Sequence, residues 1–521
     1  MEDHAGKRYR PWEPHRYAQE SHSPASRLPE GDLVFFLLET VPGLDLSQFY
    51  AYYEEETRGA PPFDPAMMVC LLLYAYCVGV FSSRKIALAC ERNLAFLAIV
   101  GVDRPDFRTV SDFRKIHLDA FVGVFIEVLR LAGAAGLIKL GNIAIDGTKI
   151  QGNASRHKAM SYGYMKKEEQ RLRAEIAALM RQAQEQDATE DAVLGCRRGD
   201  ELPEELRRRE QRLAVIQAAK QRLEEEARVA AEAERQRRKE AEAERQRRGQ
   251  KARGKPPKPV QDLPDDKAQV NFTDPELAIM KVNNKGWDCC GNAQAGVDGG
   301  CQIILACDVT DATNDKQQAV PMGQATLANL KQAGIERPRD EAGQEQKIPA
   351  TLDSGYYSEA AAKGMEEAGF DPYIATGRQK HHAAESEAAE AVVPETIEPK
   401  TAASAAAWVA TALVAAALVA TDAVEAVPPT QAASETQASA RATATTAKEK
   451  MAAKLRTPAG RALYARRKAI VEPVFGQIKG ARGFRRFLLR GLAKVRGEWR
   501  LVCLTHNLLK IWRYRCAPTV N

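Results

Sequence analysis

The sequence lacks the cysteine spacings that mark common zinc sites and disulfide frameworks. Its ten cysteines are scattered over 521 residues, with no C-x-x-C pair and no pair of histidines near them. Structural zinc sites are built from such pairs, and small secreted domains hold their cysteines in regular frameworks. The spacing therefore argues against both kinds of protein and indicates a reducing compartment.

Long hydrophobic runs are also scarce. The first 20 residues are polar and aromatic without an apolar centre, so we expect no signal peptide. One alanine-dominated stretch, residues 405–420, is apolar but barely long enough to span a bilayer, and polar low-complexity sequence flanks it. We interpret it as a buried or partner-packed helix and expect no membrane partner.

Charge is plentiful but unevenly placed, although the net charge is only +6. Between Lys479 and Arg515, eleven Lys or Arg residues stand against a single acid, Glu498. Such a basic stripe is typical of a phosphate-binding surface, although a solvated helical face would have the same composition. From about residue 166 to 253 the chain mixes both signs in a Glu, Lys, Arg, Gln and Ala sequence, which predicts a long exposed helix or a helical hairpin.

Hydrophobic patterning divides the chain into several parts. The first part has the long apolar faces of helices, and FRTVSDFRKIH within it fits a helix-turn-helix-like unit that would present Arg108, Arg114 and Lys115 to DNA. An ordinary helical bundle fits the same outline. Short β-branched runs bounded by glycine then predict a mixed α/β core. The predicted parts are a helical domain at 28–137, the core at 139–165 and 268–382, a charged arm and linker at 166–267, an alanine-rich insertion at 383–450 and a basic helical part at 451–516.

Three acidic residues stand where a purely structural role is awkward. Asp146 follows the apolar run NIAI, Asp353 follows PATL, and Glu472 stands alone in the basic segment IVEPVFGQIKGARGFRR. A few hard oxygen ligands at strand ends and on a neighbouring helix would suit a magnesium ion. Aspartate before glycine is also common turn chemistry. Pro473 predicts that Glu472 lies at a helix start or kink.

Several segments together resemble one protein family. AIDGTKI, TLDSGYYSE and YARRKAIVEPVFGQIKGARGFRRFLLRGL occur in the order found in DDE transposases of bacterial insertion sequences. The resemblance extends to FRTVSDFRKIH, NFTDPE, NAQAGVD with VTDATND, and EWRLVCLTHNLLKIW, and so covers most of the chain outside the two insertions. It implies an α/β fold with an RNase H-like catalytic core and an N-terminal helical domain.

The resemblance also implies roles for individual residues. Asp146, Asp353 and Glu472 would converge as a catalytic triad that binds Mg²⁺ or Mn²⁺, and Lys479, seven residues after the glutamate, would contact a phosphate. The family pattern has an arginine four residues before the glutamate and a tyrosine three residues before that arginine.

Here Lys468 occupies the arginine position, Arg467 is adjacent, and Tyr464 is displaced by one residue. The expected DNA contacts are Lys479, Lys468, Arg467, Arg482, Arg485, Arg486, Arg490, Arg114 and Lys115.

The function implied by the resemblance is transposition of an insertion sequence. Metal-dependent cleavage at the terminal inverted repeats would be followed by strand transfer into target DNA, without a covalent protein intermediate. The expected partners are double-stranded DNA and further copies of the chain, in the bacterial cytoplasm at the nucleoid. Two alternatives remain open: a decayed transposase that acts as a DNA-binding scaffold, and a metal-dependent nuclease that cleaves without joining strands.

Overall fold

The computed structural model describes residues 11–12, 24–54, 61–194, 204–247, 249, 259–282, 286–377 and 446–516. The chain divides into two compact units, residues 1–376 with 451–521, and residues 377–450. The alanine-rich stretch predicted as a helix lies outside the described residues. Among the described helices, none has both the length and the apolar character needed to cross a bilayer.

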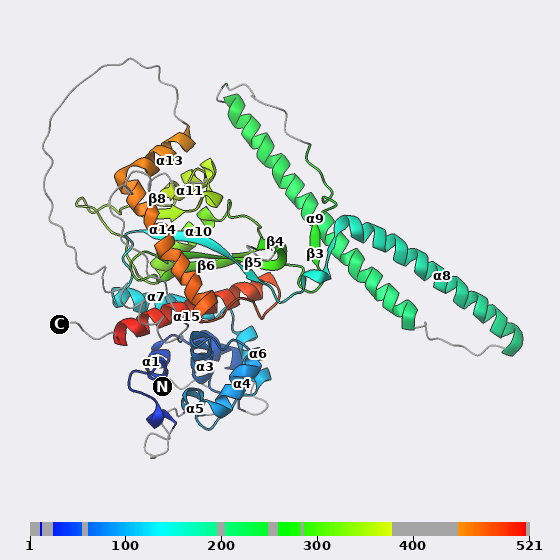
Figure 1. Ribbon diagram of the computed structural model, residues 1–521, viewed down its shortest axis with the longest axis horizontal. Coiled ribbons are helices and arrows are strands. Elements are labelled where there is room, and N and C mark those ends of the chain that lie inside the picture. Colours follow the sequence, from blue (N-terminus) through cyan, green and yellow to red (C-terminus); the bar gives the residue numbers. More distant parts are fainter. Residues whose placement is uncertain are drawn as a thin grey trace, which may run out of the picture. The chain divides into compact units, whose positions relative to one another are not determined.

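The N-terminal part is helical, as the sequence predicts (Figure 1). Local capping sets where its helices begin. Asp64 accepts a hydrogen bond from the Ala66 amide before the helix that starts at Pro65, and Asp106 accepts one from the Thr109 amide. The helices are α1 (Leu33–Thr40), α2 (Ser47–Glu54), α3 (Pro65–Cys77), α4 (Ser83–Arg92), α5 (Leu94–Val100), α6 (Phe107–Ile116) and α7 (Phe121–Ala134).

A mixed sheet forms the centre of the α/β part. Its strand order is β4-β5-β1-β7-β8, and β6 pairs with the same side of β5 as β4. Strand β1 is antiparallel to β5 and parallel to β7, and β7 is parallel to β8. Strands β5 and β6 are antiparallel and form a hairpin that turns after Asp298. The strands are β1 (Ile143–Gln151), β4 (Ala278–Val282), β5 (Gly286–Asp298), β6 (Ile304–Thr310), β7 (Ile348–Leu352) and β8 (Phe370–Ile374).

Helices pack on both faces of this sheet. Gly296 on β5 lies against Thr326 of α10, while Asp146 on β1 binds Arg467 of α14. Gly296 pairs with Ile145, the neighbour of Asp146, and neighbouring residues on a strand point to opposite faces. The helices of this part are α10 (Ala319–Gln332), α11 (Glu359–Glu367), α13 (Ala447–Arg456), α14 (Pro458–Gly476), the π-helical segment Gln477–Ala481 and α15 (Leu492–Cys516).

The NFTDPE segment fixes the start of α15. The buried Asp274 carboxylate accepts the Gly491 amide, and Glu276 accepts the Leu492 amide at the first residue of the helix. Negative charge stabilises a helix N-terminus, where the first amides have no partner within the helix. This segment therefore ties the edge of the sheet to the basic C-terminal part.

The charged arm is a helical hairpin, as predicted (Figure 1). Helix α8 (Tyr162–Leu194) runs antiparallel to α9 (Glu204–Arg247), with Arg209 paired to Glu175 and Lys220 to Glu169. At its base, β2 (Ala159–Ser161) pairs antiparallel with β3 (Gln269–Asn271). A small separate hydrophobic cluster holds the hairpin together; its buried members are Tyr162, Met165, Leu172, Ile216, Leu223 and Val270.

Candidate active site

Asp146 and Asp353 lie side by side where the parallel strands β1 and β7 stop pairing. Ile145 of β1 pairs with Leu352 of β7, so the next residue on each strand is an aspartate. Neighbouring strands lie about 4.8 Å apart. After this point β1 continues, while the chain after β7 turns away at Ser354, whose amide donates to Asp353. Two of the three predicted carboxylates therefore meet where the strands separate.

Arg467 of α14 binds the first of these aspartates. Its Nη1 donates to Asp146 Oδ2 at 2.9 Å, and the arginine is only 6% exposed. The guanidinium carbon also lies 5.8 Å from the centre of the Tyr464 ring. Tyr464 and Arg467 thus keep the three-residue spacing of the family pattern. Arg467 precedes Glu472 by five residues instead of four, so this chain has one additional residue between them. The neighbouring Lys468 is exposed.

The electrostatic setting of Asp146 favours a bound cation. The pKa of its carboxyl is raised to about 6, mainly by burial and also by the negative charges of Asp353 and Asp315. The Arg467 charge and the Gly147 amide oppose the rise. Three neighbouring carboxylates with a single arginine leave an excess of negative charge.

Lys479 lies along the free edge of β1. Its Nζ donates to the Thr148 hydroxyl and, at 2.8 Å, to the Lys149 carbonyl, beyond the point where β1 leaves β7. It belongs to the π-helical segment after α14, and such π turns are frequent at functional sites. Burial lowers the pKa of Lys479. The lysine is therefore two residues along the strand from Asp146.

Of the two alternatives predicted from Pro473, a helix start or a kink at Glu472, the helix start is wrong. Both residues lie inside α14. Proline removes the amide that would bind the carbonyl of Ala469, and Gln302 Nε2 donates to that carbonyl at 3.0 Å instead. This replacement partner lets the helix continue through Pro473.

Glu472 is exposed, and it follows Arg467 by five residues, or about 140° around a helix. When Arg467 faces Asp146, Glu472 therefore points elsewhere. Within the described ranges, no three His, Cys, Asp or Glu side chains are placed so that they could hold one metal ion. The structure brings Asp146 and Asp353 together and leaves Glu472 outside such a group.

Three of the predicted DNA contacts follow the continuation of β1. Arg486 Nε donates to the Gln151 side chain, Arg490 Nε donates to the Asn153 carbonyl, and Arg485 Nε donates to the Lys479 carbonyl. All three arginines are exposed. They form a basic row that begins at Lys479.

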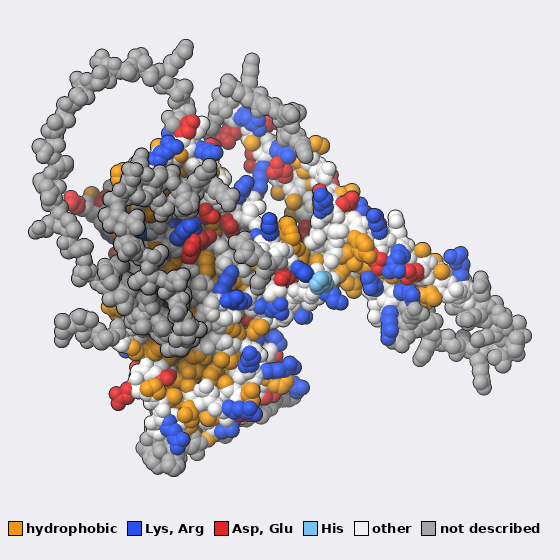
Figure 2. Space-filling view, viewed as in Figure 1, with side chains coloured by type: hydrophobic (Ala, Val, Ile, Leu, Met, Phe, Trp, Pro, Cys, Tyr) orange, Lys and Arg blue, Asp and Glu red, His pale blue; other side chains and the backbone are white. Residues whose placement is uncertain are grey.

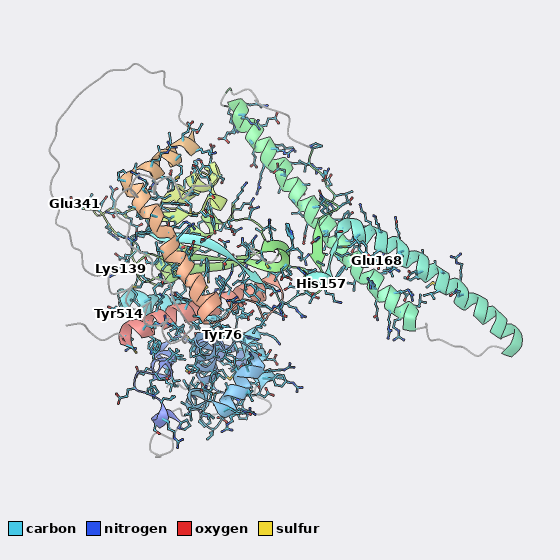
Figure 3. All side chains as sticks on the ribbon, in the orientation of Figure 1. Tyr76, Lys139, His157, Glu168, Glu341 and Tyr514 are labelled. Atoms are coloured by element: carbon cyan, nitrogen blue, oxygen red, sulfur yellow. The ribbon has the colours of Figure 1, made fainter. Side chains whose placement is uncertain are left out.

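Arg114 and Arg482, also predicted as DNA contacts, are buried like Arg467 but bind interior groups away from the aspartates, and this corrects the sequence interpretation for these two. Arg114 donates to the Tyr76 hydroxyl, labelled in Figure 3, and to the Phe81 carbonyl. Arg482 donates to the Thr505 hydroxyl, and burial lowers its pKa to about 10. Both side chains are less than 10% exposed and serve the interior of the protein.

Exposed cations of the helical block lie on α4 and α6 instead. Figure 2 shows Lys and Arg side chains along the side of the block where these helices lie. The exposed Phe107 ring has the Arg84 guanidinium 5.2 Å and the Arg108 guanidinium 5.6 Å from its centre. Lys85 and the predicted Lys115 are also exposed, and Lys115 pairs with Asp112.

Sequence reasoning missed a polar layer beside the aspartates. It consists of Asp315, Asn292, Gln294 and Tyr356, which are joined by hydrogen bonds. A signal was present, because NAQ within an otherwise apolar strand places two amides in a buried position. VTDATND carries Asp315, but nothing in the sequence indicates which strand it faces.

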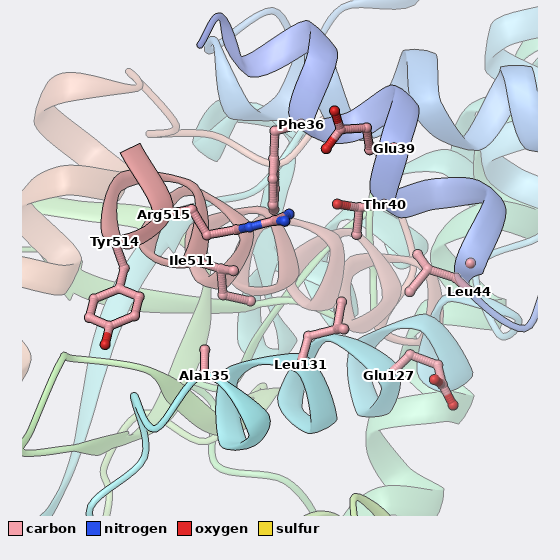
Figure 4. Close-up of a pocket in the computed structure, with 11 residues that line it drawn as sticks. Phe36, Glu39, Thr40, Leu44, Glu127, Leu131, Ala135, Ile511, Tyr514 and Arg515 are labelled. Atoms are coloured by element: carbon pink, nitrogen blue, oxygen red, sulfur yellow. The ribbon is translucent and has the colours of Figure 1, made fainter. Parts of the chain in front are cut away.

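A hollow of about 830 Å³ lies between α1, α7 and α15 (Figure 4). Its lining includes the apolar side chains of Phe36, Leu131 and Ile511 and the charged side chains of Glu39 and Arg515. None of the predicted site residues lines it, so it is separate from the aspartates.

Comparison with known families identifies two segments. Residues 429–512 match the model of a transposase DDE domain, and residues 22–116 match the model of a transposase domain. The first match contains Arg467, Glu472 and Lys479 but neither aspartate. No curated protein and no solved structure gives a significant match.

Proposed function

Because these two matches mark the chain as a DDE-type transposase of the insertion-sequence kind, we propose that it cleaves DNA at terminal inverted repeats and transfers the strands to target DNA. The mixed sheet with its flanking helices would be the RNase H-like catalytic core. One observation carries the proposal: Asp146 and Asp353 directly follow Ile145 and Leu352, the last paired residues of the adjacent parallel strands β1 and β7, and Arg467 binds Asp146.

The residues present suit a hard divalent cation such as Mg²⁺ or Mn²⁺. Asp146 and Asp353 offer carboxylate oxygens, which these ions prefer, and the surrounding charge is negative. A bound metal would polarise water, and later a 3′ hydroxyl, for attack on a phosphodiester. Glu472 is the proposed third ligand, and it requires α14 to turn this side chain toward the aspartates.

Arg467 would change partners during the reaction. In the protein alone it neutralises Asp146. When a cation takes over that charge, the planar guanidinium is free to bind a DNA phosphate through two parallel hydrogen bonds. Lys479, two residues along β1, would hold the next phosphate.

DNA would contact two separate basic surfaces. Arg485, Arg486 and Arg490 would follow the phosphate backbone away from the aspartates. The exposed cations of α4 and α6, including Lys115, would bind the terminal inverted repeats. The active complex would contain further copies of the chain, because two transposon ends must be joined to one target.

The test is incubation of the full-length protein with a labelled inverted-repeat end, target DNA and Mg²⁺. Wild type is compared with Asp146→Asn, Asp353→Asn and Glu472→Gln, and Asp311→Asn, an exposed acid of the same loop as Asp315, is the matched control. Joined products that the three site variants lose and the control keeps would support transposition.

Cleavage without joining would favour the nuclease alternative. End binding with no cleavage, in wild type as in the variants, would favour a DNA-binding scaffold and contradict the enzyme. Loss in both aspartate variants but not in Glu472→Gln would remove the glutamate from the triad.

A further inference from the structure

We propose that Asp315 is a positioning residue of this active site, which holds the middle of β1 and the turn after β7 so that Asp146 and Asp353 can share one metal ion. The inference rests on the proposed function and extends it to a residue outside the predicted triad. Asp315 lies in the segment between β6 and α10.

The Asp315 carboxylate organises a chain of buried hydrogen bonds. Its Oδ1 accepts from Asn292 Nδ2 at 2.8 Å and from Gln294 Nε2 at 2.7 Å. Gln294 Nε2 also donates to Asn292 Oδ1, and Gln294 Oε1 accepts from the Tyr356 hydroxyl. Gln294 and Tyr356 are fully buried, and Asn292 is 2% exposed. The chain of bonds thus runs from β5 to the turn that follows Asp353.

The same carboxylate lies against both aspartate-bearing segments. A Cβ at Gly147, directly after Asp146, would lie 2.8 Å from Asp315 Oδ1 and 2.3 Å from Gln294 Nε2. A Cβ at Gly355 would lie 3.7 Å from Asp315 Oδ2. Only glycine allows the network to approach β1 this closely. Asp315 therefore lies beside the backbone that follows each aspartate.

A carboxylate suits this position better than a neutral acceptor, because hydrogen bonds to a charged oxygen are about twice as strong as those to an amide oxygen. The two amide NH₂ groups of Asn292 and Gln294 converge on one oxygen, and both require an acceptor because they are buried. Groups that orient metal ligands in this way typically change metal affinity by 10–100-fold when they are substituted. A purely structural role would instead lower stability and leave metal affinity unchanged in the folded protein.

The experiment measures binding of Mn²⁺ alone to the full-length protein, by electron paramagnetic resonance. Asp315→Asn should weaken Mn²⁺ binding by about 10–100-fold while affinity for end DNA stays within about twofold of wild type. Asp353→Asn should abolish the binding, and the loop control Asp311→Asn should not change it. Tyr356→Phe, which removes the far end of the network without introducing a new polar group, should give a smaller loss in the same direction.

A double variant tests whether Asp315 acts through its hydrogen bonds or through a negative charge at residue 315. When Asp315→Asn is combined with Gln294→Glu, the carboxylate and the amide exchange places, and the carboxylate on β5 accepts from the loop amide and from the Tyr356 hydroxyl. Recovery of most of the lost Mn²⁺ affinity would support positioning through hydrogen bonds.

Three results would overturn the inference. Unchanged Mn²⁺ affinity in both Asp315→Asn and Tyr356→Phe, with loss in Asp353→Asn, would leave the proposed metal site intact and remove Asp315 from it. Loss in Asp315→Asn as complete as in Asp353→Asn, without recovery in the double variant, would make Asp315 a ligand instead. Wild-type binding in Asp146→Asn and Asp353→Asn would contradict the proposed metal site itself.

Discussion

Arg114 and Arg467 are both buried near an acidic side chain, but the groups that surround the two acids differ. Near Arg114, Glu498 accepts the Leu488 and Leu489 amides and the Tyr76 hydroxyl, and it is fully buried. Near Arg467, the Asp146 side chain keeps 21% of its surface exposed. Its other neighbours include two carboxylates.

The difference separates a structural acid from a candidate catalytic one. Neutral donors satisfy the oxygens of Glu498, so nothing further is needed there, and the network joins α3 and α6 to α15. Asp146 lies among like charges that one arginine does not balance. The two arginines have similar burial, so the surroundings of the acid, and not the burial of the ion pair, distinguish the sites.

The largest expected effect is at Asp146. Asp146→Asn should lower strand cleavage by at least about 10³-fold, because a neutral amide is a poor ligand for a hard cation. The midpoint of thermal unfolding should not fall, since burial disfavours the ionised form of Asp146. Single-turnover cleavage and thermal unfolding of the same preparation measure both quantities. A large fall in stability would remove the contrast with Glu498.

Substitutions in the network of Glu498 and Arg114 should instead lower stability and leave cleavage unchanged. Glu498→Gln should lower the free energy of unfolding by about 3 kcal/mol, because the buried Arg114 charge then has no compensating carboxylate. Urea unfolding measures this, and Arg114→Met should cost a similar amount. The double variant should cost less than the sum of the two, since they share one network. Cleavage by the folded fraction should stay close to wild type.

Substitution of Arg467 tests whether the site at Asp146 requires a guanidinium group or only a positive charge. Arg467→Lys retains the charge but loses the planar fork, and should lower cleavage by about 10-fold or more. The neighbouring Arg466 is exposed, so Arg466→Gln is a matched control with little expected effect. Equal losses in both variants would mean that the basic charge of α14 matters and the contact with Asp146 does not.

Exposed arginines extend the comparison to DNA binding. Arg84→Gln and Arg108→Gln should each reduce the slope of log affinity against log salt by about one, as expected for loss of one phosphate contact. Arg130→Gln on α7, where the exposed arginine pairs with Glu127, is the control. Filter binding of end DNA across salt concentrations measures the slopes. Unchanged slopes in both variants would move the DNA surface away from α4 and α6.

The smallest expected effect concerns pH. Burial beside Phe49 and Phe113 lowers the pKa of His117 to about 4, from an ordinary value near 6.5. Between these values the unfolded chain binds more protons than the folded one, so stability falls as pH drops from 6.5 toward 4. Urea unfolding at about pH 7 and about pH 5 should show this loss, and His117→Gln should reduce it. An equal loss in the variant would assign the pH dependence to other groups.

The sequence predicts the pairing of Asp146 with Asp353, because each aspartate directly follows a run of apolar strand residues. The helical N-terminal part and the hairpin arm also follow from local patterning. Arg114 and Arg482 could not be assigned in this way, since burial of an arginine depends on acceptors such as Tyr76 and Thr505 from distant helices. A basic pattern alone gives the same prediction for a surface and for an interior.

Positions on one helix were equally hard to separate. Arg467 and Lys468 differ by about 100° of rotation, and only packing of α14 on the sheet decides which one meets Asp146. The helix start predicted at Glu472 could not be excluded from the sequence, because the side chain that replaces the hydrogen bond lost at Pro473 comes from Gln302, far away in the chain. Asp315 was overlooked for the same reason, as its partners lie on β5 and after β7.

The two short strands at the base of the arm make it a separable module. Ser161 and Gln269 are paired neighbours, so the chain leaves and re-enters the rest of the protein at one place. A segment inserted between such neighbouring points imposes no distance on the aspartates, whatever its length. The arm could therefore lengthen, shorten or be exchanged during evolution, and an engineer could replace α8 and α9 with a tight turn or a reporter domain.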